Sequence, residues 1–150
     1  MTQLWDFSGG IHPAENKHLS TSRPITDAGL PEVLVLPLQQ HIGEPAEACV
    51  AVDDRVLKGQ KVADVTGGMG VPVHAPTSGT IESVSLQPVP HPSGMSDWCI
   101  TLKPDGKDEW APLNPVTNYR DLDRETALER IRDAGISGMG AAHALSADHR

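Results

Sequence analysis

Turn residues are spaced densely through the middle of this chain, and that spacing limits what it can fold into. Between residues 33 and 103, short runs of valine, leucine and isoleucine are separated by glycine, proline or paired polar residues. Turn signals that recur roughly every 8–12 positions are typical of a small β-sandwich or barrel. The sequence therefore predicts a mostly β domain of about six or seven short strands over residues 33–105.

The composition shows how such a domain can build its core. Aromatic residues are only 3% of the 150 residues, so the core must come from valine, leucine and isoleucine, which suit short strands. Pro37 is expected to mark the end or an edge position of the first strand, because proline cannot donate to a sheet ladder. The strands are expected at residues 33–38, 49–52, 56–57, 61–65, 71–75, 80–86 and 98–102.

The two flanks differ from this middle part. Residues 1–32 are expected to form an irregular N-terminal arm, interrupted by prolines and glycines, with Trp5 and Phe7 as the large side chains that pack it on the sandwich. Residues 106–150 begin as a linker. A helix is expected at about 121–134, where apolar residues recur at helical spacing.

Capping residues support this helix. Asp121 or Asp123 can cap its N-terminus by accepting a bond from an otherwise unpaired amide. Gly135 stands where a left-handed residue is favoured just after the C-terminus.

The charge balance excludes several functional classes. The formal net charge is -8, and no run of lysine or arginine is present. Nucleic acid is therefore not an expected partner, because affinity for it comes largely from cationic contacts to phosphate. No stretch approaches the roughly 18 apolar residues needed to span a bilayer, so direct membrane insertion is not expected. The first ten residues lack the basic and apolar regions of a signal peptide.

Side chains that often carry chemistry are present without a recognisable arrangement. None of the seven histidines forms an i,i+4 pair or accompanies a Cys-x-x-Cys motif, so no metal site is predicted. His74 is interpreted as a hydrogen-bonded structural histidine. Cys49 and Cys99 are too few for a disulfide framework, and a reduced setting is expected. No catalytic residue is predicted, since the chain has neither a Walker loop nor a nucleophile elbow.

Two glycine-rich segments remain. Residues 67–70 lie between two predicted strands and are expected to form a hairpin tip, where glycine supplies a positive φ. Residues 135–140 follow the predicted helix. They fit a helix C-cap and loop, or a loop whose amides approach a phosphate. A dinucleotide-binding loop would instead follow a strand and open a helix.

Two stretches resemble the biotinyl/lipoyl-type barrel-sandwich hybrid. Residues 52–62 read Val-Asp-Asp-Arg-Val-Leu-Lys-Gly-Gln-Lys-Val, and residues 73–81 read Val-His-Ala-Pro-Thr-Ser-Gly-Thr-Ile. A carrier domain of this kind presents a lysine at its hairpin tip. Residues 66–70 contain no lysine, since Lys58 and Lys61 precede them. A biotin- or lipoyl-type carrier function is therefore kept only as an alternative.

Three longer stretches resemble the N-terminus of the C subunit of the Rnf/Rsx electron-transport complex. Residues 5–19 contain Gly-Gly-Ile-His-Pro, residues 36–46 contain Gln-His-Ile-Gly-Glu-Pro, and residues 130–140 read Arg-Ile-Arg-Asp-Ala-Gly-Ile-Ser-Gly-Met-Gly. The resemblance runs from about residue 5 to residue 140. An alternative family is the related N-terminal region of a sodium-pumping NADH:quinone oxidoreductase subunit, in which we do not recognise the Gly-Gly-Ile-His-Pro motif.

The resemblance implies a peripheral subunit on the cytoplasmic side of the bacterial inner membrane. Its partners would be the other subunits of an ion-translocating complex, NADH and a ferredoxin-like electron carrier. A full-length member would also contain an FMN- and NADH-binding domain and two [4Fe–4S] clusters. This chain would supply the N-terminal docking or structural part, with no cofactor and no complete active site of its own.

Two details come from comparing the chain with this family. Gly138 and Gly140 are interpreted as the remnant of the loop that binds the flavin phosphate. Residues 141–150 do not match the way that loop continues in the family, and we interpret them as a sign of truncation or of a shifted reading frame.

Overall fold

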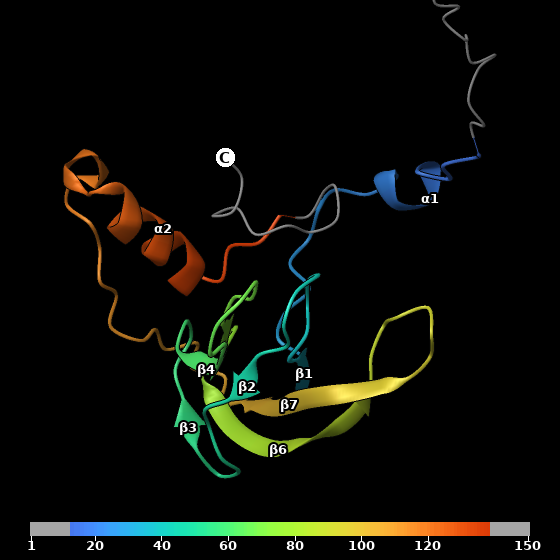
Figure 1. Ribbon diagram of the computed structural model, residues 1–150. Coiled ribbons are helices and arrows are strands. Elements are labelled where there is room, and N and C mark those ends of the chain that lie inside the picture. The colour runs from blue at the N-terminus through green and yellow to red at the C-terminus, as the bar shows by residue number, and fades with distance from the viewer. Residues whose placement is uncertain (1–12, 139–150) are drawn as a thin grey trace, which may run out of the picture.

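The computed structural model describes residues 13–138, and Figure 1 shows a curled β-structure with one longer helix beside it. The elements are, in chain order, helix α1 (His18–Thr21), strands β1 (Leu34–Pro37), β2 (Glu47–Ala48), β3 (Arg55–Val56), β4 (Lys61–Asp64), β5 (Val73–His74), β6 (Gly79–Pro88) and β7 (Ser96–Pro104), the 3₁₀ helix η1 (Tyr119–Asp121) and helix α2 (Arg124–Asp133). The predicted mostly β fold is confirmed.

The strands form two sheets. One has four strands in the order β1-β7-β6-β3, and the other has three in the order β2-β4-β5. The long β6–β7 hairpin dominates the larger sheet and curls around the core (Figure 1). Its register changes between Ile81 and Ser83, which leaves Glu82 as an extra residue. Such a bulge bends the strand and increases its twist, which helps a sheet to curl.

The core contains aliphatic side chains and no aromatic ring among the described residues. Ile81, Ile100 and Leu102 from the β6–β7 hairpin are fully buried, as are Val56 of β3 and Val62 of β4. Strands β6 and β7 place Ile81 opposite Leu102, so the two side chains share one face of the sheet. The expected core of valine, leucine and isoleucine is confirmed.

One strand prediction is wrong. Residues 49–52 are not a strand, and β2 lies just before them at Glu47–Ala48. The side chain of Asp54 accepts a bond from the amide of Ala51 at 2.7 Å, and Asp53 has a φ of 71°. The amide of Cys49 still donates to the carbonyl of Val62 on β4 at 3.0 Å, but the turn starts inside the apolar run and ends the pairing there.

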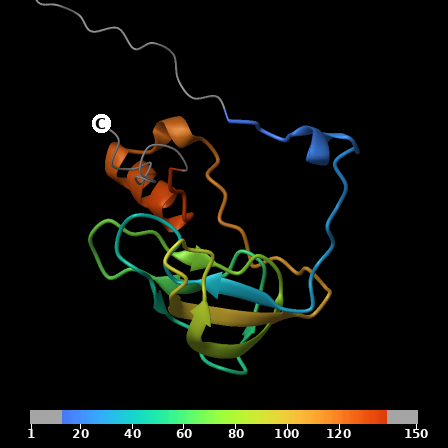
Figure 2. The ribbon, with the colours of Figure 1, turned by 90° about the vertical axis from the view of Figure 1, so that its right-hand side faces the viewer.

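The arm and the helix follow their predicted outlines. Residues 13–32 are exposed throughout and contain only the short helix α1, and Figure 2 shows them leading into β1. Trp5 and Phe7 lie outside the described residues. Helix α2 begins after the expected residue 121, because Asp123 caps it by accepting from the amide of Thr126 at 2.9 Å. Gly135 comes after it with a φ of 71°, as predicted.

The hydrogen-bonded framework continues past residue 105. Lys58 pairs with Trp110 in a parallel bridge, through Lys58 N–H to Glu109 O at 2.8 Å and Ala111 N–H to Lys58 O at 2.9 Å. The first residues of the predicted linker therefore pack on the sandwich. Within residues 13–138, no helix is both long enough and apolar enough to cross a membrane.

Candidate functional site

The hairpin tip, where a carrier domain would present its lysine, contains no lysine here. Residues 66–70, called the tip below, connect β4 to β5. Lys61 lies at the start of β4, and Lys58 lies in the bridge to Trp110. The structure thus confirms that the tip lies between two strands and places both lysines outside it.

Residues 39–46, called the covering segment below, lie against the tip. The amide of Glu44 donates to the carbonyl of Met69 at 2.8 Å, and the amide of Val71 donates to Nε2 of His41 at 3.3 Å. A Cβ atom on Gly43 would lie only 1.9 Å from the Met69 carbonyl oxygen, and one on Gly68 would lie 2.6 Å from a carboxylate oxygen of Glu44. The contact with a backbone carbonyl requires glycine at position 43. At position 68 the flexible Glu44 side chain could move away, and it is the φ of 68° that favours glycine.

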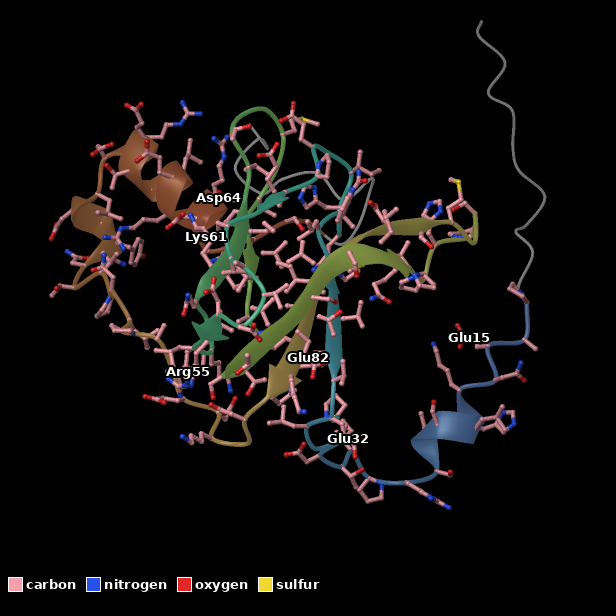
Figure 3. The ribbon with its side chains drawn as sticks, turned by 90° about the horizontal axis from the view of Figure 1, so that it is seen from below. Glu15, Glu32, Arg55, Lys61, Asp64 and Glu82 are labelled. Atoms are coloured by element: carbon pink, nitrogen blue, oxygen red, sulfur yellow. The ribbon has the colours of Figure 1, made fainter. Side chains whose placement is uncertain are left out.

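Lys61 joins β4 to helix α2. Its Nζ donates to Asp64 at 2.9 Å and also to Asp133, in the last turn of α2. Figure 3 shows Lys61 and Asp64 side by side, close to the helix. Hydrogen bonds to Asp133 and then Asp64 raise the pKa of Lys61, and the bond from Lys61 lowers the pKa of Asp64. These three residues, the Lys61 cluster, hold the end of α2 against the sandwich.

A cavity of about 620 Å³ lies beside the Lys61 cluster, between the tip and α2. Its walls are mostly polar or charged, and Arg130 on its helical side donates to the carbonyl of Asn114 at 3.2 Å. Helix α2 thus has a second link to the chain that precedes it.

His74, on β5, lies under the segment that comes after α2. A Cβ atom on Gly135 would be 2.9 Å from the carbonyl oxygen of Pro72 and 3.2 Å from Nδ1 of His74. Burial, and then the charge of Lys61, lower the pKa of His74, so its ring favours the neutral form. Its position under the helix end agrees with the structural role predicted for it.

The loop at residues 105–109, called the acidic loop below, closes the other side of the sandwich. The fully buried hydroxyls of Ser78 and Thr77 donate to Asp105 at 2.7 Å and to Asp108 at 2.8 Å, and the Ser78 hydroxyl also accepts from the amide of Glu109 at 2.9 Å. Both carboxylate pKa values are lowered, Asp105 mainly by Ser78 and Asp108 mainly by a lysine.

Basic side chains complete the acidic loop. Lys58 Nζ lies 2.6 Å from the Asp108 carboxylate and 4.9 Å from the centre of the Trp110 ring. Arg55 bonds to Glu109 at 2.6 Å and to Asp105 at 3.3 Å, and Figure 3 shows it at this end of the sandwich. Lys58 therefore serves to fix this loop.

Comparison with known proteins agrees with this geometry. Residues 5–107 match the family model described as the RnfC barrel sandwich hybrid domain. The chain belongs to this family. It is 54% identical over 140 residues to the C subunit of the ion-translocating oxidoreductase complex of Vibrio cholerae (strain O395), covering 93% of this chain and 18% of that protein. The match confirms the predicted resemblance and the barrel-sandwich hybrid fold.

Other relatives carry the same description. The C subunit of the ion-translocating oxidoreductase complex of Serratia proteamaculans is 48% identical, and that of Yersinia pestis (strain Antiqua) is 46% identical. Both matches cover 93% of this chain, and 20% and 22% of the relatives. The chain thus spans about a fifth of the length of the curated relatives that it matches.

The cofactor residues predicted for this family member lie only partly within the described residues. Gly138 is described and half-buried, whereas Gly140 lies outside the described range, so their role as the remnant of a flavin-phosphate loop stays a prediction. Cys49 is exposed and Cys99 is buried, and both are free thiols. Among residues 13–138, no three histidine, cysteine or carboxylate side chains gather as a metal site would require.

Sequence reasoning missed the covering segment and the acidic loop as contact regions. The Gln-His-Ile-Gly-Glu-Pro motif marks the family, but nothing local links Gly43 to the tip. The acidic loop carries a usable signal, because residues 105–109 place three carboxylates shortly after the buried strand β7.

Proposed function

We propose that this chain is the N-terminal docking and structural part of a peripheral electron-transfer subunit. The subunit would belong to a membrane-bound, ion-translocating complex of the NADH:ferredoxin oxidoreductase type, on the cytoplasmic side of the bacterial inner membrane. FMN and two [4Fe–4S] clusters would be held by other parts of a full-length subunit. The observation that carries this proposal is the match of residues 5–107 to the RnfC barrel sandwich hybrid domain. The structure adds the Lys61 cluster, which joins helix α2 to the sandwich.

The tip supports a structural role over the alternative carrier role. A carrier needs a lysine on an accessible tip, but this tip has none, and Gly43 and Glu44 cover one side of it. The lysine closest to it, Lys61, is bonded to two carboxylates, which keeps it charged and therefore a poor nucleophile for acylation.

Helix α2 supports a role in positioning the next part of a full-length subunit. Its C-terminal end is bound by Lys61, and Gly135 fits closely over His74. These contacts therefore position the end of α2 and Gly135 relative to the sandwich. A scaffold of this kind is what a flavin-binding domain would need at its N-terminal border.

Binding to the membrane subunits tests the proposal. The tagged chain would be added to solubilised membranes from bacteria that express the other subunits of the complex but lack the C subunit. We expect those subunits to be recovered with the tag at a fixed ratio, and not with an unrelated lipoyl domain used as a control. Recovery no greater than with the control would contradict the docking proposal.

Two further measurements separate the alternatives. Incubation with a biotin or lipoate ligase should leave the intact mass unchanged, and an acyl-sized increase would revive the carrier function. Reconstitution of the pure chain with FMN should leave no flavin absorbance after desalting. A retained flavin band would show that residues around Gly138 form a complete cofactor site.

A further inference from the structure

An open apolar groove lies along the edge of the larger sheet. Strand β1 is the edge strand of this sheet, and the arm at residues 13–33 leads into it (Figure 2). The groove has a volume of about 990 Å³ and lies between β1, the covering segment and residues 89–91. Val35 is 45% exposed and Ile42 is 54% exposed on its walls. Apolar side chains gathered in a hollow favour an apolar occupant.

The backbone of β1 also favours an extended occupant. Leu38 bonds to Trp98 on β7, and the register pairs Leu36 with Ile100, so alternate residues of β1 face β7. The amide and carbonyl of Val35 therefore point away from β7, toward the groove. Pro37 has no N–H, and its carbonyl accepts from the side chain of Gln40 at 3.0 Å. One short strand could pair beside Val35 and would end at Pro37.

The charge of the groove narrows the choice of occupant. Its lining includes one carboxylate, Asp97, and no lysine or arginine. A phosphorylated partner or one with several carboxylates would find no lysine or arginine there. A segment with large aromatic side chains and few charges fits better, because large rings bury much apolar area with few polar groups.

We infer that this groove binds residues 5–11 of the same chain. This segment reads Trp-Asp-Phe-Ser-Gly-Gly-Ile and carries two of the five aromatic residues of the sequence. Its single charged residue, Asp6, would face the opposite side of an extended segment from Trp5 and Phe7. Side chains at positions i and i+2 of an extended segment share one face, so Trp5 and Phe7 can enter the groove together. None of residues 13–32 is buried, so the described part of the arm does not fill the groove.

The connection between segment and groove makes this binding favourable. The segment is tied to β1 through the arm, and an extended chain reaches roughly 3.3–3.6 Å per residue, ample for a return to the same edge. A tethered segment binds at a high effective concentration, so modest contacts suffice. The groove is thus the surface on which Trp5 and Phe7 would pack the arm against the sandwich, as predicted.

Hydrogen exchange and methyl NMR on the 150-residue chain test this inference. In a Trp5→Ala/Phe7→Ala variant, we expect the Val35 amide to exchange about tenfold faster or more, and the Val35 and Ile42 methyl signals to shift. The control variant is Leu19→Ala/Ile25→Ala, which removes apolar side chains of the same arm that are 74% and 104% exposed. It should leave these signals unchanged.

A second variant reports from the groove itself. Ile42→Asp should reproduce the faster exchange of Val35, while the methyl signals of the buried Val62 show that the core stays folded. Equal exchange rates in the parent and in Trp5→Ala/Phe7→Ala would overturn the inference. So would protection of Val35 that disappears on dilution, because a second copy of the chain would then be the occupant.

Discussion

The covering segment and the acidic loop both fasten a remote stretch of chain to a turn of the sandwich, but they use different physics. At the tip, backbone atoms meet so closely that a single Cβ on Gly43 would overlap the Met69 carbonyl. At the acidic loop, buried hydroxyls and two basic side chains hold carboxylates. The first contact depends mainly on the close approach of backbone atoms, whereas the second depends on charge. A substitution can therefore break the contact at the tip without breaking the contact at the acidic loop, and the reverse.

Adding one methyl group to the covering segment, where it faces the tip, should have the largest effect. Gly43→Ala forces its Cβ to within 1.9 Å of a carbonyl oxygen, so the covering segment must move away from the tip. We expect a loss of about 2–4 kcal/mol in the free energy of unfolding, measured by urea denaturation. The matched control is Gly67→Ala, on the tip itself, because its Cβ would have no neighbour within 4 Å. Equal losses for the two variants would contradict the close-packing account.

Removing the buried hydroxyl under the acidic loop should have the next largest effect. Ser78→Ala leaves the amide of Glu109 without its partner. It also removes one of the donors to the carboxylate of Asp105, which keeps its bond from Arg55. A lost bond of this kind costs about 1–3 kcal/mol, measured by the same denaturation. Ser93→Ala, in an exposed loop, is the comparison and should be close to neutral. A neutral Ser78→Ala would show that the loop does not depend on that hydroxyl.

The response to acid should distinguish the two regions. The pKa values of Asp105 and Asp108 are lowered from 3.8, so folding is favoured by their ionisation above about pH 4 and loses this contribution as the pH falls through the lowered values. Acid titration followed by circular dichroism should show a shallower loss of stability in Asp105→Asn/Asp108→Asn than in the parent chain. Gly67→Ala, which adds a methyl group in open space, should keep the parent's pH dependence. Identical acid curves for all three proteins would contradict the claim that the acidic loop depends on charge.

Breaking the Lys61 cluster should have the smallest effect on overall stability. The side chain of Asp133 is 70% exposed, so its ion pair with Lys61 contributes less than about 1 kcal/mol. Lys61→Met should instead speed amide hydrogen exchange in α2 while the exchange of β6 and β7 stays the same. Lys103→Met, which removes an exposed pair with Glu82, is the control and should leave α2 unaffected. Unchanged exchange in α2 would mean that Lys61 does not hold the helix.

The strands of the sandwich are predictable because the residues that define them are neighbours in the sequence. Turn residues and alternating valines reveal short strands without knowledge of the rest of the chain, and Asp123 and Gly135 bound the helix in the same way. The prediction fails at residues 49–52, where an apolar run suggests a strand but the Asp54 side chain bonds the Ala51 amide and turns the chain.

The contacts that define the candidate site are not predictable from the sequence alone, because they join distant residues. Lys61 and Asp133 are 72 positions apart, and Arg55 and Glu109 are 54 apart. Nothing in the spacing of either pair marks it as an ion pair. Gly43 likewise looks like an ordinary loop glycine until the tip is placed against it.

Competition for the membrane subunits tests the central claim most directly. Membranes stripped of the native C subunit would be incubated with a fixed amount of that subunit, full-length and labelled, and increasing amounts of this chain. The docking account predicts that the labelled protein retained on the membranes falls as the chain is added, and that the chain takes its place. Undiminished retention of the labelled protein at a large excess of the chain would contradict it.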